Sequence, residues 1–84
     1  MNTLQRYMKQ NNLNANAISS LCSIDPERVQ MWLTRDNVGL VISMSTKEFA
    51  TISTMFTMIG ASGSFGNDLI AETQKQLQDD GVTV

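Results

Sequence analysis

The dipeptide Asp25-Pro26 constrains the fold of this chain more than any other local feature. Aspartate is a strong helix N-cap, and proline suits the first helical position because its missing N–H would be unpaired there. Glu27 then lies in the first turn, where a negative charge is favourable. The dipeptide therefore predicts a helix that begins at Pro26 and ends between Thr34 and Asp36. Its apolar stripe is formed by Val29, Trp32 and Leu33.

Regular apolar spacing predicts further helices on both sides of this one. The ranges 3–11 and 15–22 carry apolar side chains three and four positions apart, and the asparagine-rich stretch 11–14 predicts a turn between them. Ser45 with Glu48 three residues later has the form of a capping box, which predicts another helix start. The inner face of that helix is expected to consist of Phe49, Ile52, Phe56 and Ile59.

Two segments lie between and after these helices. The apolar, β-branched run 38–44 is compatible with a short strand or with a loop packed over the core. A connector rich in glycine and serine, 60–66, precedes a last helix. That helix is predicted to open at Asn67-Asp68, to reach about Gln78 and to be stopped by Gly81.

Size and composition narrow the function classes. Eighty-four residues form one domain with one modest core. With no histidine and one cysteine, Cys22, the chain has neither an internal disulfide nor a usual zinc site, and we expect Cys22 to be a small buried hydrophobe. No cofactor is expected. No apolar run approaches the roughly 18 residues of a membrane span and no signal peptide is recognisable, so we expect a cytoplasmic protein without a membrane partner.

The residues that most enzymes need are missing or scattered. Cys22 has no histidine to act as its base, and the carboxylates are not paired at catalytic spacing. Gly60, Gly63 and Gly66 lack the preceding strand and the following lysine of a phosphate-binding loop. We therefore expect no enzymatic activity and no small-molecule substrate.

Charge is distributed unevenly along the chain. Residues 1–47 carry five basic and three acidic side chains, whereas residues 48–84 carry one basic and five acidic side chains. The first part is therefore mildly basic and the second acidic, within a net charge of −2. This asymmetry permits nucleic-acid binding by the first part but does not by itself indicate it.

Two short helices joined by a tight turn form the pattern that points most directly to a function. A helix-turn-helix needs an apolar residue inside its first helix, with a small residue beside it where the helices cross. It also needs an apolar residue after the turn and two more on the inner face of the second helix. These positions are occupied by Ile18, Ser19, Ile24, Val29 and Trp32.

Over residues 15–33, ANAISSLCSIDPERVQMWL, the sequence resembles the helix-turn-helix of the lambda repressor and Cro-like family of phage and bacterial regulators. The family usually has alanine where Ser19 stands and glycine where Ser23 stands, and serine is small enough for both positions. The resemblance implies that residues 26–34 form a recognition helix in the major groove of double-stranded DNA, while the preceding helix lies across the backbone.

Together these features predict an all-α fold. We expect a small helix-turn-helix domain of four to five short helices, with a short strand or extended segment near 38–44 left open. Residues 1–60 are expected to form the DNA-binding domain. Residues 61–84 are expected to form a connector and a C-terminal helix that packs on this domain or mediates oligomerisation.

Helical spacing turns four side chains to the outer face of the expected recognition helix, since Val29 and Trp32 face inward. The candidates for base contacts are Glu27, Gln30, Met31 and Thr34. Gln30 can pair bidentately with adenine, Glu27 can accept from the N4 amino group of cytosine, and Met31 can touch a thymine methyl group. Gln30 is equally compatible with an ordinary solvated side chain.

Phosphate contacts are expected from nearby cations and from the start of the first helix of the motif. The candidates are Lys9, Arg28, Arg35, Asn14 and Asn16. The two asparagines lie near a helix N-terminus, where backbone N–H groups favour an anion. For Arg28 the alternative is a surface ion pair with Glu27 or Asp25.

Few basic side chains of one copy of this chain can reach DNA, so a monomer should bind weakly. We therefore expect a homodimer built from the C-terminal half, which would read two half-sites about one helical turn apart. Apolar surface for such a contact is available in the 38–44 run, in the methionines and in the last helix. The alternative is a protein-interaction module, such as a small phage antirepressor that binds a regulatory protein instead of DNA. The acidic pI near 4.7 and the many methionines favour that alternative.

Overall fold

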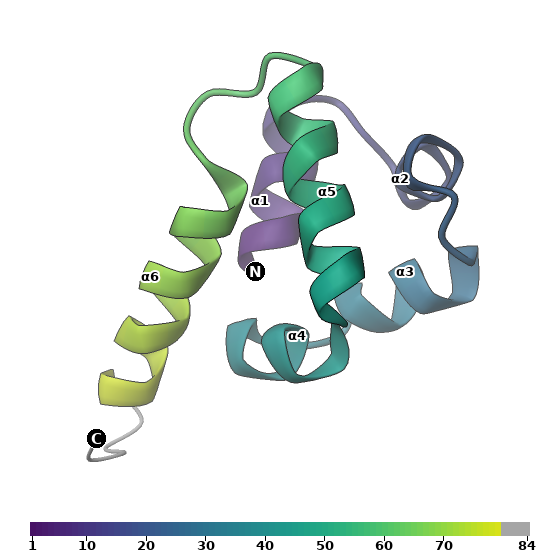
Figure 1. Cartoon of the computed structure of the whole chain (residues 1–84). Coiled ribbons are helices and arrows are strands. Elements are labelled where there is room, and N and C mark those ends of the chain that lie inside the picture. The colour runs from purple at the N-terminus through teal and green to yellow at the C-terminus, as the bar shows by residue number, and fades with distance from the viewer. Residues whose placement is uncertain (80–84) are drawn as a thin grey trace.

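Six helices make up the fold in the computed structural model, which describes residues 1–79 (Figure 1). In chain order they are α1 (Thr3–Gln10), α2 (Ala15–Cys22), α3 (Pro26–Leu33), α4 (Asn37–Ser43), α5 (Thr46–Met58) and α6 (Phe65–Asp79). Helix α5 lies in the middle, with α6 on one side, α2 and α3 on the other and α4 beneath it (Figure 1). The predicted all-α class is confirmed, and residues 1–79 contain no strand. The predicted stop at Gly81 lies outside the described residues.

The predicted helix starts follow from local hydrogen bonds. Asn2 caps α1, since its side-chain oxygen accepts the N–H of Gln5 at 2.8 Å. The predicted capping box at the start of α5 is present, because the Glu48 N–H donates to Ser45 Oγ at 3.1 Å and the Ser45 N–H donates to Glu48 Oε1 at 2.8 Å. Each bond satisfies a backbone group that a helix end leaves unpaired.

The run 38–44 is neither a strand nor a loop, and the prediction there was wrong. Its residues form α4, which raises the number of helices among residues 1–79 from the expected four or five to six. The Asp36 side chain caps α4 by accepting the N–H of Gly39 at 2.8 Å. Leu40 and Met44, four positions apart, are the buried residues of this segment. Capping and packing therefore override the β-branched composition.

The inner faces of the last two helices differ in detail from the prediction. In α5, Ile52 and Phe56 are buried as expected and Phe49 is half-buried, but Ile59 is exposed because the helix has already ended at Met58. In α6 the helix begins at Phe65, two residues before the predicted start, and Phe65 and Leu69 are its buried residues. These two side chains fix α6 against the rest of the domain.

An aromatic cluster joins α1, α5 and α6 in the core. The ring of Tyr7 packs edge-on against Phe56 and Phe65, with centroid distances of 5.2 and 5.4 Å. The Tyr7 hydroxyl donates to Asp68. The pKa of Tyr7 is raised to about 12, mainly by burial and to a smaller extent by this hydrogen bond. Helix α6 contacts α1, α4 and α5 and so closes the side of the domain away from α2 and α3.

Candidate nucleic-acid interface

Helices α2 and α3 form the predicted helix-turn-helix geometry. In Figure 1 α2 is seen end-on while α3 lies across the view, so the two axes cross at a steep angle. The turn between them is held by Ser19, whose hydroxyl donates to the carbonyl of Ile24 at 2.5 Å while the Ile24 N–H donates back to the Ser19 carbonyl at 3.2 Å. The serine hydroxyl, which alanine lacks, thus closes the turn.

Ser23 ends α2 in the left-handed conformation, with φ 54° and ψ 43°. This region of backbone space favours glycine, which bears no Cβ. The backbone at Ser23 therefore adopts a conformation that a residue with a Cβ does not favour.

The centre of the motif's inner face is fully buried, whereas Ile24 and Leu33 at its edge are half-buried. Trp32 and Val29 on α3 and Ile18 on α2 are each 0% exposed, and Cys22 is buried beside them as predicted. Burial raises the pKa of the Cys22 thiol. Asp25 caps α3, since its side chain accepts the N–H of Glu27 at 2.9 Å. The orientation of α3 is thus fixed by its core contacts, which leave the opposite face to solvent.

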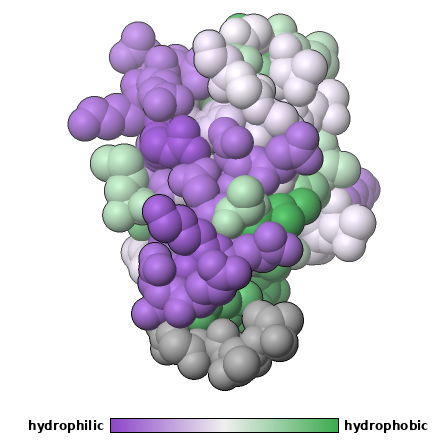
Figure 2. All heavy atoms as spheres, turned by 90° about the vertical axis from the view of Figure 1, so that its left-hand side faces the viewer, coloured by the Kyte–Doolittle hydropathy of each residue, from purple (hydrophilic) through white to green (hydrophobic). Residues whose placement is uncertain are grey.

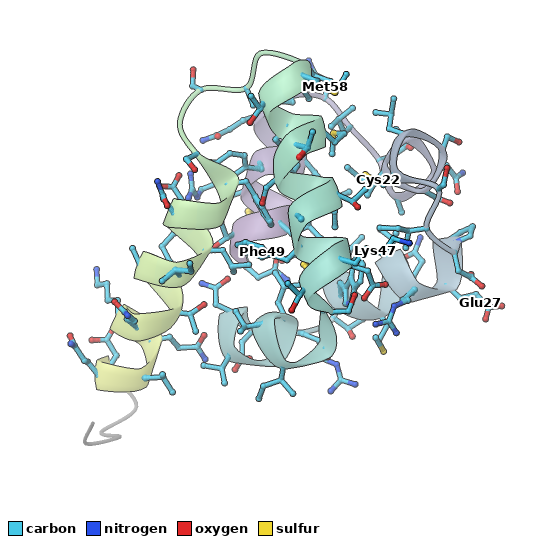
Figure 3. The ribbon with its side chains drawn as sticks, viewed as in Figure 1. Cys22, Glu27, Lys47, Phe49 and Met58 are labelled. Carbon is cyan, nitrogen blue, oxygen red and sulfur yellow. The ribbon has the colours of Figure 1, made fainter. Side chains whose placement is uncertain are left out.

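The outer face of α3 carries three of the four predicted base-contact residues in exposed positions. Glu27, Gln30 and Thr34 are exposed, and Figure 3 shows Glu27 pointing away from the molecule. The Thr34 hydroxyl donates to the Met31 carbonyl at 2.7 Å, whereas the side chains of Glu27 and Gln30 form no hydrogen bond within residues 1–79. The fourth residue, Met31, is half-buried and packs against the core. It can offer a groove only part of its side chain.

The predicted phosphate-contact residues differ in how available they are. Lys9, at the end of α1, and Arg35, after α3, are exposed. Asn16 is exposed in the first turn of α2. Asn14 is exposed as well, but its side-chain oxygen caps α2 by accepting the Ala17 N–H at 2.8 Å, which leaves its amide group free for a ligand.

The guanidinium of Arg28 is bound within the protein, although its side chain stays partly exposed. Its guanidinium pairs with Glu48 of α5 and donates to the Ser43 carbonyl at 2.8 Å. It also lies over the Trp32 ring, 5.5 Å from the ring centroid. The hydrogen bond to Arg28 lowers the pKa of Glu48 to about 2. The partner is neither Glu27 nor Asp25, and the pair ties α3 to α5.

Lys47 is a cation that sequence reasoning did not assign to the interface. It is exposed in the first turn of α5 and shares a surface hollow with Ser23, Asp25 and Arg28. Figure 3 shows it at the end of α5 nearest α3. The capping box places Lys47 at a helix start, but no sequence feature indicates that this start lies beside the turn of the motif.

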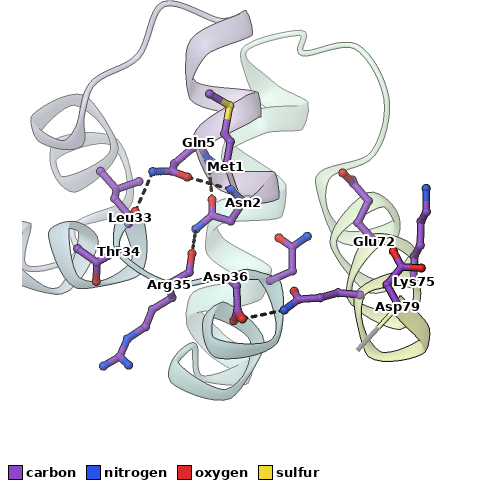
Figure 4. A pocket seen from close by; sticks show the side chains of 12 residues that line it. Met1, Asn2, Gln5, Leu33, Thr34, Arg35, Asp36, Glu72, Lys75 and Asp79 are labelled. Carbon is purple, nitrogen blue, oxygen red and sulfur yellow. Dashed lines mark hydrogen bonds between the residues drawn. The ribbon is translucent and has the colours of Figure 1, made fainter. Parts of the chain in front are cut away.

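The C-terminus of α3 is capped by side chains from the start of α1 (Figure 4). The Asn2 amide donates to the carbonyls of Trp32 and Arg35, each at 2.9 Å, and the Gln5 amide donates to the Leu33 carbonyl at 2.7 Å. Asn2 is buried. These residues border a polar hollow of about 670 Å³ between α1, α3 and α6. Two residues that cap α1 therefore also hold the end of α3.

Comparisons with family models, with curated proteins and with solved structures found no match to this chain. A function must therefore be argued from the geometry of α2 and α3. Residues 1–79 contain no cluster of three potential metal-ligating side chains. None of the described helices has the length and apolar character needed to cross a membrane.

Proposed function

We propose that this protein is a sequence-specific, DNA-binding transcriptional regulator of the phage repressor type, with residues 26–34 as its recognition helix. In this proposal α3 enters the major groove and α2 lies across the sugar-phosphate backbone. The protein acts in the cytoplasm as a homodimer.

One observation carries the proposal. Between two eight-residue helices, Ser23 adopts the left-handed turn that buries Val29 and Trp32 and leaves Glu27 and Gln30 exposed on the opposite face. A carboxylate and a carboxamide with no partner among residues 1–79 are free to bond to base edges.

Electrostatics support weak binding by a single copy. Arg28 is neutralised by Glu48, so the cations left near α3 are Arg35 and Lys47, opposed by Glu27 and Asp25. Each phosphate that a protein neutralises adds to the affinity and to its salt dependence. Two copies on one duplex double the number of these contacts, which is why the proposal includes a homodimer.

Selection of bound duplexes from a random DNA pool tests the proposal. The expected result is enrichment of a two-fold symmetric site with half-sites about one helical turn apart. Retention on random DNA should also fall steeply as salt rises. Recovery of no enriched sequence, together with salt-independent retention, would contradict the proposal.

A second candidate function is a protein-interaction module that binds another regulator, such as an antirepressor. The exposed apolar side chains Leu21, Ile42, Met58 and Ile70 favour it, because protein interfaces use such surface. This candidate predicts that the protein passes a heparin column without retention at low salt. The DNA-binding proposal predicts retention there.

A further inference from the structure

An apolar groove runs between α2 and α5, on the side of the domain away from α6. Its volume is about 550 Å³, and its walls include Leu21 of α2 and Ala50, Thr54 and Met58 of α5. Met58 is 81% exposed and Leu21 is 55% exposed. The groove is thus lined by small side chains and by large apolar ones, of which Leu21 and Met58 are exposed.

No charged residue lines this groove. The ranges 10–24 and 49–67 contain no Asp, Glu, Lys or Arg, and all the residues that line the groove come from these two ranges. Charged residues are depleted at the centre of protein interfaces, and methionine adapts its shape to a partner surface. The groove therefore has the composition of an interface core.

The absence of charge favours a second copy of this chain as the occupant. In a two-fold contact each surface meets itself, so every charge near the axis approaches its own like charge. A surface without charge avoids this repulsion even though each chain has a net charge of −2. A partner bearing charges would find no complementary group here.

The other exposed apolar surface, between α4 and α6, is less suited to this role. It includes Ile42, which is 78% exposed, and a groove of about 260 Å³ that Val41 and Ile70 help to line. The α6 side of the molecule, shown in Figure 2, is mostly hydrophilic with a narrow hydrophobic strip. A smaller hollow beside a hydrophilic helix provides less apolar surface to bury.

We propose that two copies of this chain associate through the α2–α5 groove, with Met58 of one copy seated between Leu21 and Ala50 of the other. This assigns a surface to the homodimer of the proposed function and so deepens it. The base-contact candidates Glu27, Gln30 and Thr34 do not line the groove and stay uncovered by it.

Sedimentation velocity of the full chain over a range of concentrations, without DNA, tests this inference. The wild-type protein should form a dimer, and Met58→Lys should raise the dimer dissociation constant at least about 30-fold, as for an interface hot spot. Ile42→Lys is the matched control, because it places the same charge on an equally exposed helix residue of the α4–α6 surface. It should leave the dissociation constant within about threefold of wild type.

Three outcomes would overturn the inference: a wild-type protein that stays monomeric, equal weakening by both variants, or weakening by Ile42→Lys alone. Far-UV circular dichroism and thermal unfolding of both variants show whether each is folded, and both side chains are too exposed to disturb the core. Since no DNA is present, a monomeric wild type overturns the assigned surface, and DNA selection still decides the proposed function separately.

Discussion

Ser23 bears the backbone strain of the turn between α2 and α3. A residue with a Cβ in the left-handed conformation is disfavoured by about 1–2 kcal/mol, and glycine removes this strain. Glycine also loses more conformational entropy on folding, which offsets part of the gain in stability. Ser23→Gly should therefore stabilise the domain by about 0.5–1 kcal/mol in urea unfolding. Asn12→Gly is the control, because Asn12 has the same φ of 54° but asparagine tolerates it well. A destabilised Ser23→Gly protein would contradict the strained turn.

Gln30 is the residue with the clearest expected role in base readout. If its free carboxamide pairs with one base, Gln30→Ala should relax the preference at one position of the selected site, costing about 1–3 kcal/mol there. Gln74→Ala, on the exposed face of α6, is the control and should leave the site unchanged. Equal loss of affinity for all sequences would exclude a readout role for Gln30.

The Arg28–Glu48 pair makes the free energy of unfolding depend on pH. Its hydrogen bond to Arg28 holds the pKa of Glu48 at about 2, below the ordinary 4.5, so the charged form is favoured by folding. The contribution is therefore complete above pH 4.5 and is lost as pH falls from 4.5 toward 2. In urea unfolding, Glu48→Gln should be less stable than wild type near neutrality, and the difference should shrink over that range. A difference that does not change with pH would contradict this account.

Helix starts could be predicted from single side chains, whereas helix contacts could not. Asp25 and Ser45 specify helix starts by accepting bonds from residues two or three positions away, so sequence alone suffices. The β-branched run of the α4 segment suggested a strand or a loop. Its helix depends on the packing of Leu40 and on the Asp36 cap, and the sequence alone does not show that packing. In the same way the exposed face of α3 was predictable, but the pairing of Arg28 with a residue twenty positions away was not.

The hydrogen bonds between the start of α1 and the end of α3 predict that a substitution at Asn2 lowers the free energy of unfolding more than the loss of an ordinary helix cap does. Asn2→Ala removes the cap of α1 and the side-chain amide that donates to the carbonyls of Trp32 and Arg35, so we expect a loss of about 2–4 kcal/mol in urea unfolding. Asn14→Ala removes only an exposed cap and should cost about 1 kcal/mol. Equal losses for the two variants would show that Asn2 does not hold the end of α3.

At the scale of the whole molecule, packing divides the surface into regions with different expected roles. Helix α6 closes one side of the domain through Phe65 and Leu69, and the α2–α5 groove lies on the other. The outer face of α3 belongs to neither, which leaves it free to meet a DNA groove. We expect this face, together with the start of α2, to be the contact surface for DNA.

An NMR titration of the full chain with random-sequence duplex DNA tests that claim most directly, because it reports every backbone amide at once. We expect the largest chemical-shift changes to fall within residues 26–34 and near Asn14 and Asn16, and to weaken as salt is added. Shifts confined to α6 or to the α2–α5 groove, or no shifts at low salt, would contradict it.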